Sequence, residues 1–452
     1  MIKAVAATGA LGTGFKAETL AKAAEGADFI GCDAGSSDPG PYYLGSGEML
    51  ASPAALSRDL ELMIAAGLKH RIPVLVGSAG TAGARPQLER SVEIIRQLAA
   101  KNGWHFKLGI IDSEIAAETV VEAFKDGKLT ALAGAPDIDE ASIMAAAHVV
   151  AMQGPDCFID ALDQGADVVI AGRTSDTAIY AAIPIMRGIP KGIAFHAAKI
   201  LECGAASTVE RKYPDSMVSY IDHESFVVDP PNPQMLCTAQ SVASHVLYET
   251  ANPYRLAEPD GVLVTENSQY EAVSDRAVRV TGSQFEDADA YTVKLEAATL
   301  RGYREVVFGS IRDPLVIDQI DSFVDTVQAV ITQKIKDSLG LAPSDFSWRW
   351  SVYGKNGSMG PLEPVNRVEG HEIVLLIEIL SGSPDLASAI GSITWHTVLH
   401  QPIPEYGGLV SQIAFPFSPP AVSVGAAYEF SINHVMRLDR PDATYTLTLE
   451  NL

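Results

Sequence analysis

The sequence is poor in cysteine and in basic residues, and each shortage argues against a class of protein. Its 452 residues include 4 cysteines, which lie far apart without a Cys-x-x-Cys pair. This spacing argues against a disulfide framework or a zinc ribbon and favours a reducing, cytoplasmic location. Acidic residues outnumber basic ones 56 to 33, which gives a net charge of −23. We therefore expect neither nucleic acid nor an anionic membrane as a partner.

Long hydrophobic runs and several catalytic motifs are also absent. No stretch is long and apolar enough to cross a bilayer, and the N-terminus lacks the layout of a signal peptide. A Gly-x-Ser-x-Gly elbow and a Walker loop are missing as well. Acyl-serine hydrolases and P-loop enzymes are therefore not expected.

Apolar residues, in contrast, make up 47% of the chain and can fill a large core. Up to about residue 180, short runs that are apolar on both faces alternate with amphipathic segments, and the run 142–152 is among those that predict a helix. This alternation predicts an α/β fold with a parallel sheet of βα units, either doubly wound or a partial barrel. From about residue 215, strand-like and proline-rich pieces predict an elaborated α+β second lobe. We therefore divide the chain into an α/β domain, 1–214, and a mixed β-rich lobe, 215–452, packed on it.

Polar residues and glycines gather where the predicted parallel strands end. Ligands bind at the carboxyl ends of strands in such folds, so we expect these loops to line one small-molecule cleft. Glycines allow close backbone approach, and hydroxyls and helix-start amides can donate to an anion. The residues that we expect to bind substrate are Gly35, Ser36, Ser37, Ser78, Gly80, Thr81, Arg173, Thr174, Ser175, Lys355 and Asn356.

Two further strand-end loops belong to the same pattern. They contribute Thr8, Gly9, Gly12 and Gly14 after the first strand, and Asp112, Ser113 and Glu114 after the fourth. The glycines of the first loop are a weak nucleotide signal, because they lack the regular spacing of a dinucleotide-binding loop.

Carboxylates in these loops are candidates for acid–base catalysis, namely Asp33, Asp38 and Asp176. Neighbouring carboxylates can divide acid and base roles, because the charge of one raises the pKa of the other. Asp33 and Asp38 could instead bind a divalent ion such as Mg²⁺ or cap local amides. Arg173 could hold a carboxylate or phosphate through two parallel hydrogen bonds.

Histidines offer a second set of candidates. His396 and His400 have a spacing that can bind a transition metal on one helical face, but the glutamate of the protease motif is missing and Pro402 follows at once. Substrate contact or packing is the favoured interpretation, and we expect no metal site. Further acid–base candidates are Asp222, His223, Glu224 and His245.

Several longer stretches together resemble the acyclic terpene utilisation (AtuA) family of bacterial proteins. They are GTGF, ADFIGCDAGSSDPGPYYLGSG, VGSAGTAG, HFKLGIIDSE, AGRTSDTA, SHVLYETANPYRLAEPDG, YTVKLEAA and GSIRDPL. The resemblance runs from about residue 5 to beyond residue 430, nearly the whole chain. Longer members of this family carry a C-terminal ferredoxin-like domain that this sequence does not show. The resemblance therefore implies a separate small ferredoxin-like partner protein.

The leading hypothesis is a catabolic enzyme of the lyase or hydratase type, acting on a small carboxylic acid or acyl thioester. Asp33 or Asp38 would be the base and Asp176 its partner, while the amides near Gly35 and Gly80 would hold the developing oxyanion. The alternatives are a metal-dependent hydrolase and a non-catalytic ligand- or nucleotide-binding subunit of a larger complex. We expect a small anionic organic substrate and a homo-oligomer, and the sequence indicates no particular cofactor.

Overall fold

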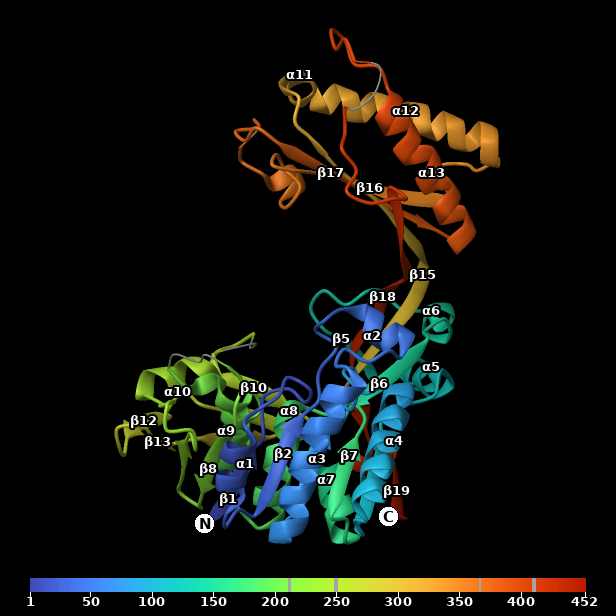
Figure 1. Cartoon of the computed structure of the whole chain (residues 1–452). Coiled ribbons are helices and arrows are strands. Elements are labelled where there is room, and N and C mark those ends of the chain that lie inside the picture. The colour runs from blue at the N-terminus through green and yellow to red at the C-terminus, as the bar shows by residue number, and fades with distance from the viewer. Residues whose placement is uncertain (210–212, 248–250, 366, 409–411) are drawn as a thin grey trace. The chain divides into compact units, whose positions relative to one another are not determined.

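The computed structural model divides the chain into two compact units (Figure 1). Unit 1 comprises Met1–Thr299 and Phe430–Leu452, and unit 2 comprises Leu300–Glu429. Strands β15 (Tyr291–Ile311) and β18 (Ala421–Leu438) therefore have residues in both units. The residues that the structure describes are 1–209, 213–247, 251–365, 367–408 and 412–452.

Unit 1 is built on a ten-stranded sheet with the order β12-β13-β9-β8-β1-β2-β3-β7-β4-β19. The central strands are parallel, and they are β1 (Ile2–Ala6), β2 (Phe29–Asp33), β3 (Val74–Gly77), β7 (Val168–Ala171) and β4 (Lys107–Asp112). The flanking strands are antiparallel, and they are β8 (Met217–Ile221), β9 (Ser225–Asp229), β13 (Val278–Thr281), β12 (Gln269–Ala272) and β19 (Thr446–Asn451). The predicted α/β fold with parallel βα units is confirmed for this centre, whereas the sheet as a whole is mixed. The predicted division at residue 214 stays a prediction, and residues from both sides of it build this sheet.

The central strands are buried on both faces because helices cover both faces of the sheet. Every residue of β2, β3 and β7 is buried, which explains their unbroken apolar sequences. The helices that share one core with this sheet are α1 (Ala17–Ala24), α3 (Pro53–His70) and α4 (Arg85–Asn102). Those that share the other core are α7 (Asp156–Asp163), α8 (Asp176–Met186) and α9 (Lys191–Leu201). The carboxyl ends of the parallel strands thus open between two packed helical layers.

Unit 1 contains several further elements. A small antiparallel sheet contains β10 (Arg255–Glu258), β11 (Gly261–Val264) and β14 (Gln284–Asp287). The segment predicted as a helix over 142–152 is instead a short helix, α6 (Glu140–Met144), followed by β6 (His148–Met152), which pairs with β15. That prediction was wrong because pairing with a distant strand outweighs the local helix preference of an alanine-rich run. The other elements are α2 (Pro41–Ser46), α5 (Ala117–Lys125), β5 (Leu129–Ala131), α10 (Ala239–Val246) and the short helices η1 (Gly204–Ser207) and η3 (Pro441–Thr444).

Unit 2 has its own core between an antiparallel sheet and helices. Strand β17 (Ile373–Ser381) alternates buried and half-buried residues and pairs with β15 and with β16 (Phe346–Tyr353). The buried face of α12 (Ile320–Leu339), which includes Val327 and Ile331, joins the same hydrophobic core. The other helices are α11 (Pro314–Asp318), η2 (Gly360–Leu362) and α13 (Pro384–His400).

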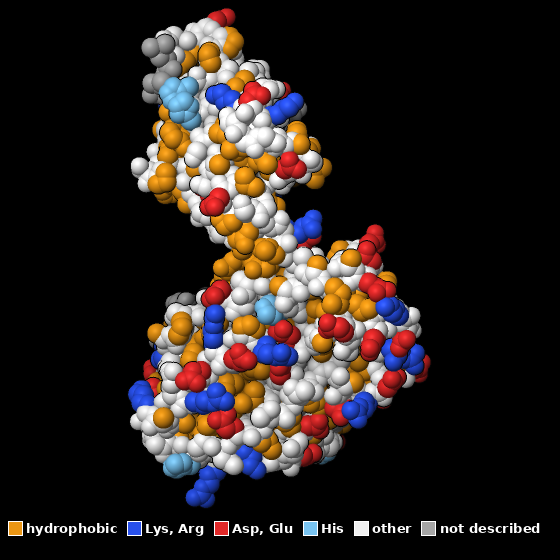
Figure 2. Space-filling view, turned by 90° about the vertical axis from the view of Figure 1, so that its right-hand side faces the viewer, with side chains coloured by type: hydrophobic (Ala, Val, Ile, Leu, Met, Phe, Trp, Pro, Cys, Tyr) orange, Lys and Arg blue, Asp and Glu red, His pale blue; other side chains and the backbone are white. Residues whose placement is uncertain are grey.

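Charged side chains of both signs are interspersed on the surface. Figure 2 shows acidic and basic groups side by side on the face in view, and several form ion pairs, such as Arg96 with Glu450 at 2.8 Å and Lys101 with Glu61 at 2.9 Å. Among the described residues, no helix is long and apolar enough to span a membrane.

Candidate active site

Arg173, in the loop after β7, is the centre of a buried polar cluster in unit 1. Its residue is only 4% exposed. Its Nε donates to Glu296 Oε2 at 2.8 Å, and its Nη1 donates to Ser78 Oγ and to the carbonyl oxygen of Thr174, both at 3.0 Å. Asp176 Oδ1 lies 3.6 Å from the same Nη1. Arg173 Nη2 forms no hydrogen bond within the described part of the chain, so it can donate to a ligand.

Glu296, on β15, is the main counter-ion of Arg173 and was missed by the sequence analysis. Its other oxygen accepts from Ser37 Oγ and from Lys294 Nζ, both at 2.7 Å. Burial raises the pKa of Glu296, but the charges of Arg173 and Lys294 outweigh it and lower the pKa to about 2. The available signal was Lys294 and Glu296 within the otherwise apolar segment 293–298 of β15. Charged residues in such a segment are rarely buried unless they are paired.

Asp33, at the end of β2, is enclosed beside this cluster. Its Oδ2 accepts from the Gly35 amide at 3.1 Å, and its buried Oδ1 has no partner among the residues that the structure describes. Burial and then the charge of Asp176 hold the pKa of Asp33 well above its usual range, although Arg173 opposes them. The surroundings of Asp33 therefore disfavour its charged form, and Glu296 is the main counter-ion of Arg173.

A cavity of about 460 Å³ opens beside Arg173. This volume suits a small organic molecule. Its polar lining comes from the strand-end loops, from α9 and from β10: Asp38, Arg173, Ser175, Asp176, Thr177, Lys199, Glu202, Asn252, Arg255 and Glu258. Apolar lining comes from Met152, Leu256 and two alanines. Cations, carboxylates and an apolar patch are thus combined around one space.

Lys199, Glu202 and Glu258 are cavity residues that the sequence analysis also missed. Lys199 Nζ donates to Glu202 Oε1. Burial is the largest single influence and lowers the pKa of Lys199, but the charge and hydrogen bond of Glu202, together with weaker influences, outweigh it and raise the pKa. Thr177 Oγ1 lies 3.0 and 2.9 Å from the two carboxyl oxygens of Glu258. Lysine and glutamate are frequent in surface helices and strands, so no local pattern separated these three from solvated residues.

Other predicted ligand residues brace the loops around the cluster. A Cβ on Gly35 would lie 2.7 Å from Thr81 Cα, so only glycine fits where these loops cross. Thr81 Oγ1 accepts from the Leu50 amide at 2.9 Å, and Gly80 is packed against Gln87 in the same way. Thr81 has a φ of 127°, a strained conformation for a β-branched residue that persists only where its surroundings enforce it.

Some predicted site residues have partners other than Arg173. Asp38 Oδ2 accepts from Ser36 Oγ at 2.7 Å and has no contact with Asp33 in the described chain. The charges of Asp176 and, less strongly, Glu202 raise the pKa of Asp33. Lys355 and Asn356 belong to unit 2, where Lys355 pairs with Asp321.

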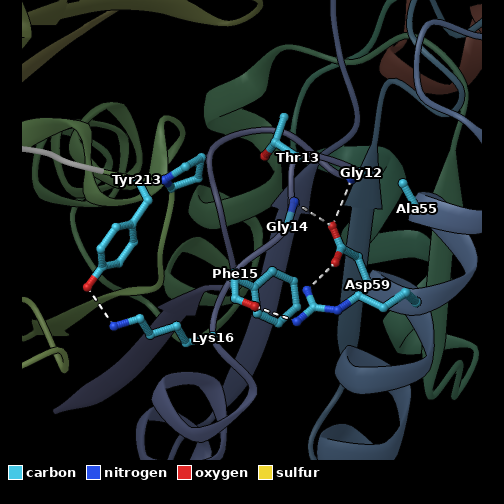
Figure 3. A pocket seen from close by; sticks show the side chains of 10 residues that line it. Gly12, Thr13, Gly14, Phe15, Lys16, Ala55, Asp59 and Tyr213 are labelled. Carbon is cyan, nitrogen blue, oxygen red and sulfur yellow. Dashed lines mark hydrogen bonds and ion pairs between the residues drawn. The ribbon is translucent and has the colours of Figure 1, made fainter.

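The glycine-rich loop after β1 is already occupied by a side chain (Figure 3). The amides of Gly12 and Gly14 donate to Asp59 Oδ2 at 2.9 and 3.1 Å. Arg58 holds the other oxygen of Asp59 at 2.6 Å and also donates to the Phe15 carbonyl. A groove of about 500 Å³ lies over this loop. Amides that could bind a phosphate therefore already bind an internal carboxylate.

The remaining candidates have local partners. His396 and His400 lie on α13 with their rings stacked, centroids 4.3 Å apart, and His400 Nδ1 contacts the His396 carbonyl. Asp222 accepts from the backbone amides of Glu224 and Ser225 in a turn. Across the described ranges, no group of three or more His, Cys, Asp or Glu side chains is placed to hold a metal ion. After β4, Asp112 accepts a hydrogen bond from Arg85, and Glu114 is hydrogen-bonded to His148.

A family model described as acyclic terpene utilisation family protein AtuA matches residues 53–209 and 221–415, well over half of the chain. The chain belongs to the AtuA family. This match confirms the resemblance and links the chain to acyclic terpene utilisation; the AtuA-matched segments include Arg173, Asp176 and Glu258. Residues 248–250, within one of the stretches that carried the resemblance, lie outside the described residues. No curated protein and no solved structure matches the chain.

Proposed function

We propose that this AtuA-family chain is a catabolic lyase or hydratase. It would take a proton from the carbon next to the carbonyl of a small acyclic carboxylic acid or acyl thioester, and then eliminate or add a group. The observation that supports this proposal is that a buried arginine with free N–H donors and a carboxylate line the same cavity.

Arg173 would anchor the substrate. Two of its nitrogen atoms are fixed by hydrogen bonds to the protein. The guanidinium is therefore already oriented, and the side chain loses little conformational entropy when Nη2 binds a substrate oxygen. The apolar lining from Met152 and Leu256 would contact the acyclic hydrocarbon part. This combination agrees with a family concerned with acyclic terpenes.

Asp176 would be the base. It stands at the first residue of α8, where the helix dipole favours the charged form. Arg173 nearby favours it further. Asp33, whose pKa is raised by burial, would lie beside the site. The nucleotide-binding alternative has less support, because Asp59 fills the amides of the glycine-rich loop.

The test is hydrogen exchange in D₂O followed by NMR. The wild-type protein is incubated with branched acyclic acids, their β-hydroxy derivatives and their thioesters, and deuterium at the α-carbon is measured. We expect exchange with at least one acid, and Asp176→Asn should reduce it by about 10²–10⁴-fold.

Asp385→Asn is the matched control, because Asp385 also lies in the first turn of a helix but belongs to unit 2. It should leave exchange intact. Loss of exchange in Asp38→Asn with retention in Asp176→Asn would move the base to Asp38. A wild-type protein that exchanges none of these compounds would contradict the proposed function.

A further inference from the structure

Glu258 lines the cavity and has a buried carboxyl group. The proton abstraction proposed for Asp176 does not involve it. Glu258 is the last residue of β10 and is 9% exposed. Its hydrogen-bond partner is the Thr177 hydroxyl, at 3.0 and 2.9 Å. No lysine or arginine forms a salt bridge with Glu258 in the described part of the chain. A buried carboxyl without a cation is costly in its charged form.

Burial and two nearby carboxylates raise the pKa of Glu258. Burial raises its pKa most, and the charges of Glu202 and Asp260 add to this, while Thr177 and Lys199 oppose it; the outcome is a pKa of about 8. The nearby Lys199 is engaged with Glu202. Glu258 therefore carries a proton at neutral pH and can donate it.

A comparison with Glu296 shows that this state comes from the surroundings. Both glutamates are almost fully buried. Glu296 contacts two cations and has a pKa of about 2, whereas Glu258 contacts a hydroxyl and has a pKa of about 8. The surroundings thus set the charge of each buried glutamate, and Glu258 is the one that favours the protonated form.

We propose that Glu258 is the acid that protonates a leaving hydroxyl group, and that the substrate of this cavity is therefore a β-hydroxy carboxylate. This inference rests on the proposed function. Asp176 takes the α-proton, and the electron pair of that C–H bond forms the C=C bond. The β-carbon–oxygen bond breaks, and its oxygen takes the Glu258 proton and leaves as water. The proton then returns from Asp176 to Glu258 through solvent in the cavity, which restores both groups.

Thr177 is the positioning residue for this acid. Its hydroxyl lies 2.7 Å from that of Ser175, and both line the cavity. It follows Asp176 directly in α8, so one short segment holds the base and orients the acid. A protonated amino group already carries the proton with which it leaves as ammonia, so it needs no acid. A hydroxyl group must receive a proton to leave as water, and the presence of an acid therefore favours a hydroxyl leaving group.

The experiment compares β-hydroxybutyrate and its branched homologues with the corresponding β-fluoro acids. Fluoride leaves without a proton, so it does not need Glu258. Glu258→Gln should lower dehydration by about 10²–10⁴-fold. Fluoride elimination and α-hydrogen exchange should change by less than about tenfold, since Asp176 still performs them. Asp176→Asn should lose all three reactions.

The pH profile provides an independent test. Dehydration by the wild type should fall as the pH rises through about 8, where Glu258 loses its proton. Thr177→Val removes a hydrogen bond that lowers this pKa, so the alkaline limb should move to higher pH. Thr177→Ser should return the limb to the wild-type position, which a purely structural role would not predict.

The outcomes separate the two proposals. A Glu258→Gln variant that dehydrates at the wild-type rate overturns the Glu258 assignment alone and leaves the proposed function standing. Equal losses on hydroxy and fluoro substrates also overturn it. A wild-type protein that neither exchanges nor dehydrates any of these acids overturns both.

Discussion

Two loops at the carboxyl ends of parallel strands both combine glycine with hydroxyl residues, and they differ in structure. After β1, the amides of Gly12 and Gly14 are satisfied by Asp59 from α3. After β7, Arg173 is fixed by Glu296 but keeps one nitrogen free beside a cavity. Composition thus identifies loops that are able to bind an anion. A side chain from a distant element decides whether the hydrogen-bond donors of the loop are already occupied.

The largest expected effect comes from removing the charge at the second loop. Arg173→Met would leave Glu296 buried with only Lys294 as a cation. We expect a loss of about 3–5 kcal/mol in unfolding free energy, measured with urea. Arg90→Met, which removes an arginine from the exposed pair with Glu48, should have little effect. An equal, small loss of unfolding free energy in both variants would contradict the difference expected between the buried and the exposed ion pair.

The same variant should respond to acid. In the wild type the pKa of Glu296 in the folded state, about 2, lies below the ordinary 4.5. Its stabilising contribution is therefore complete above pH 4.5 and is lost as the pH falls towards about 2. The difference in unfolding free energy between Arg173→Met and the wild type should become smaller as the pH falls over this range. A constant difference would show that Glu296 is not the group affected.

The next effect tests the first loop. Asp59→Ala leaves the amides of Gly12 and Gly14 without an acceptor, and we expect a loss of about 2–4 kcal/mol. Asp59→Asn keeps a carbonyl oxygen and should lose less. Inorganic phosphate should raise the melting temperature of Asp59→Ala more than that of the wild type, because the two amides become available. No difference between the alanine and asparagine variants would mean that Asp59 does not hold this loop.

The smallest effect concerns how tightly the loops around Arg173 pack. Gly35→Ala places a Cβ 2.7 Å from Thr81, whereas the equivalent atom at Gly40 would meet nothing within 4 Å. Both glycines have a positive φ, 142° and 113°, so their backbone strain is comparable. We expect Gly35→Ala to cost about 1–3 kcal/mol more than Gly40→Ala in thermal unfolding. Equal costs would show that only the backbone conformation matters there.

Much of the central fold could be predicted from local patterns. The apolar runs of β2, β3 and β7 and the stripe of α4 that contains Val92 and Ile95 all lie in the cores as expected. The strand β6 was predicted as helix, because its partner β15 lies far along the chain. Arg173 and Asp176 were recognised because they follow a strand. Glu258 was missed, because its chemistry comes from burial rather than from its neighbours in sequence.

The sequence by itself determined the parallel strands, the amphipathic helices and the loops in which glycine and polar residues collect, because these depend on short-range periodicity and on backbone freedom. Only the tertiary structure decided which loop is filled and which remains open. The partner of Gly12 is 47 residues away, and that of Arg173 is 123 residues away. Charge pairing and desolvation act through space, so they are settled only when distant elements pack together.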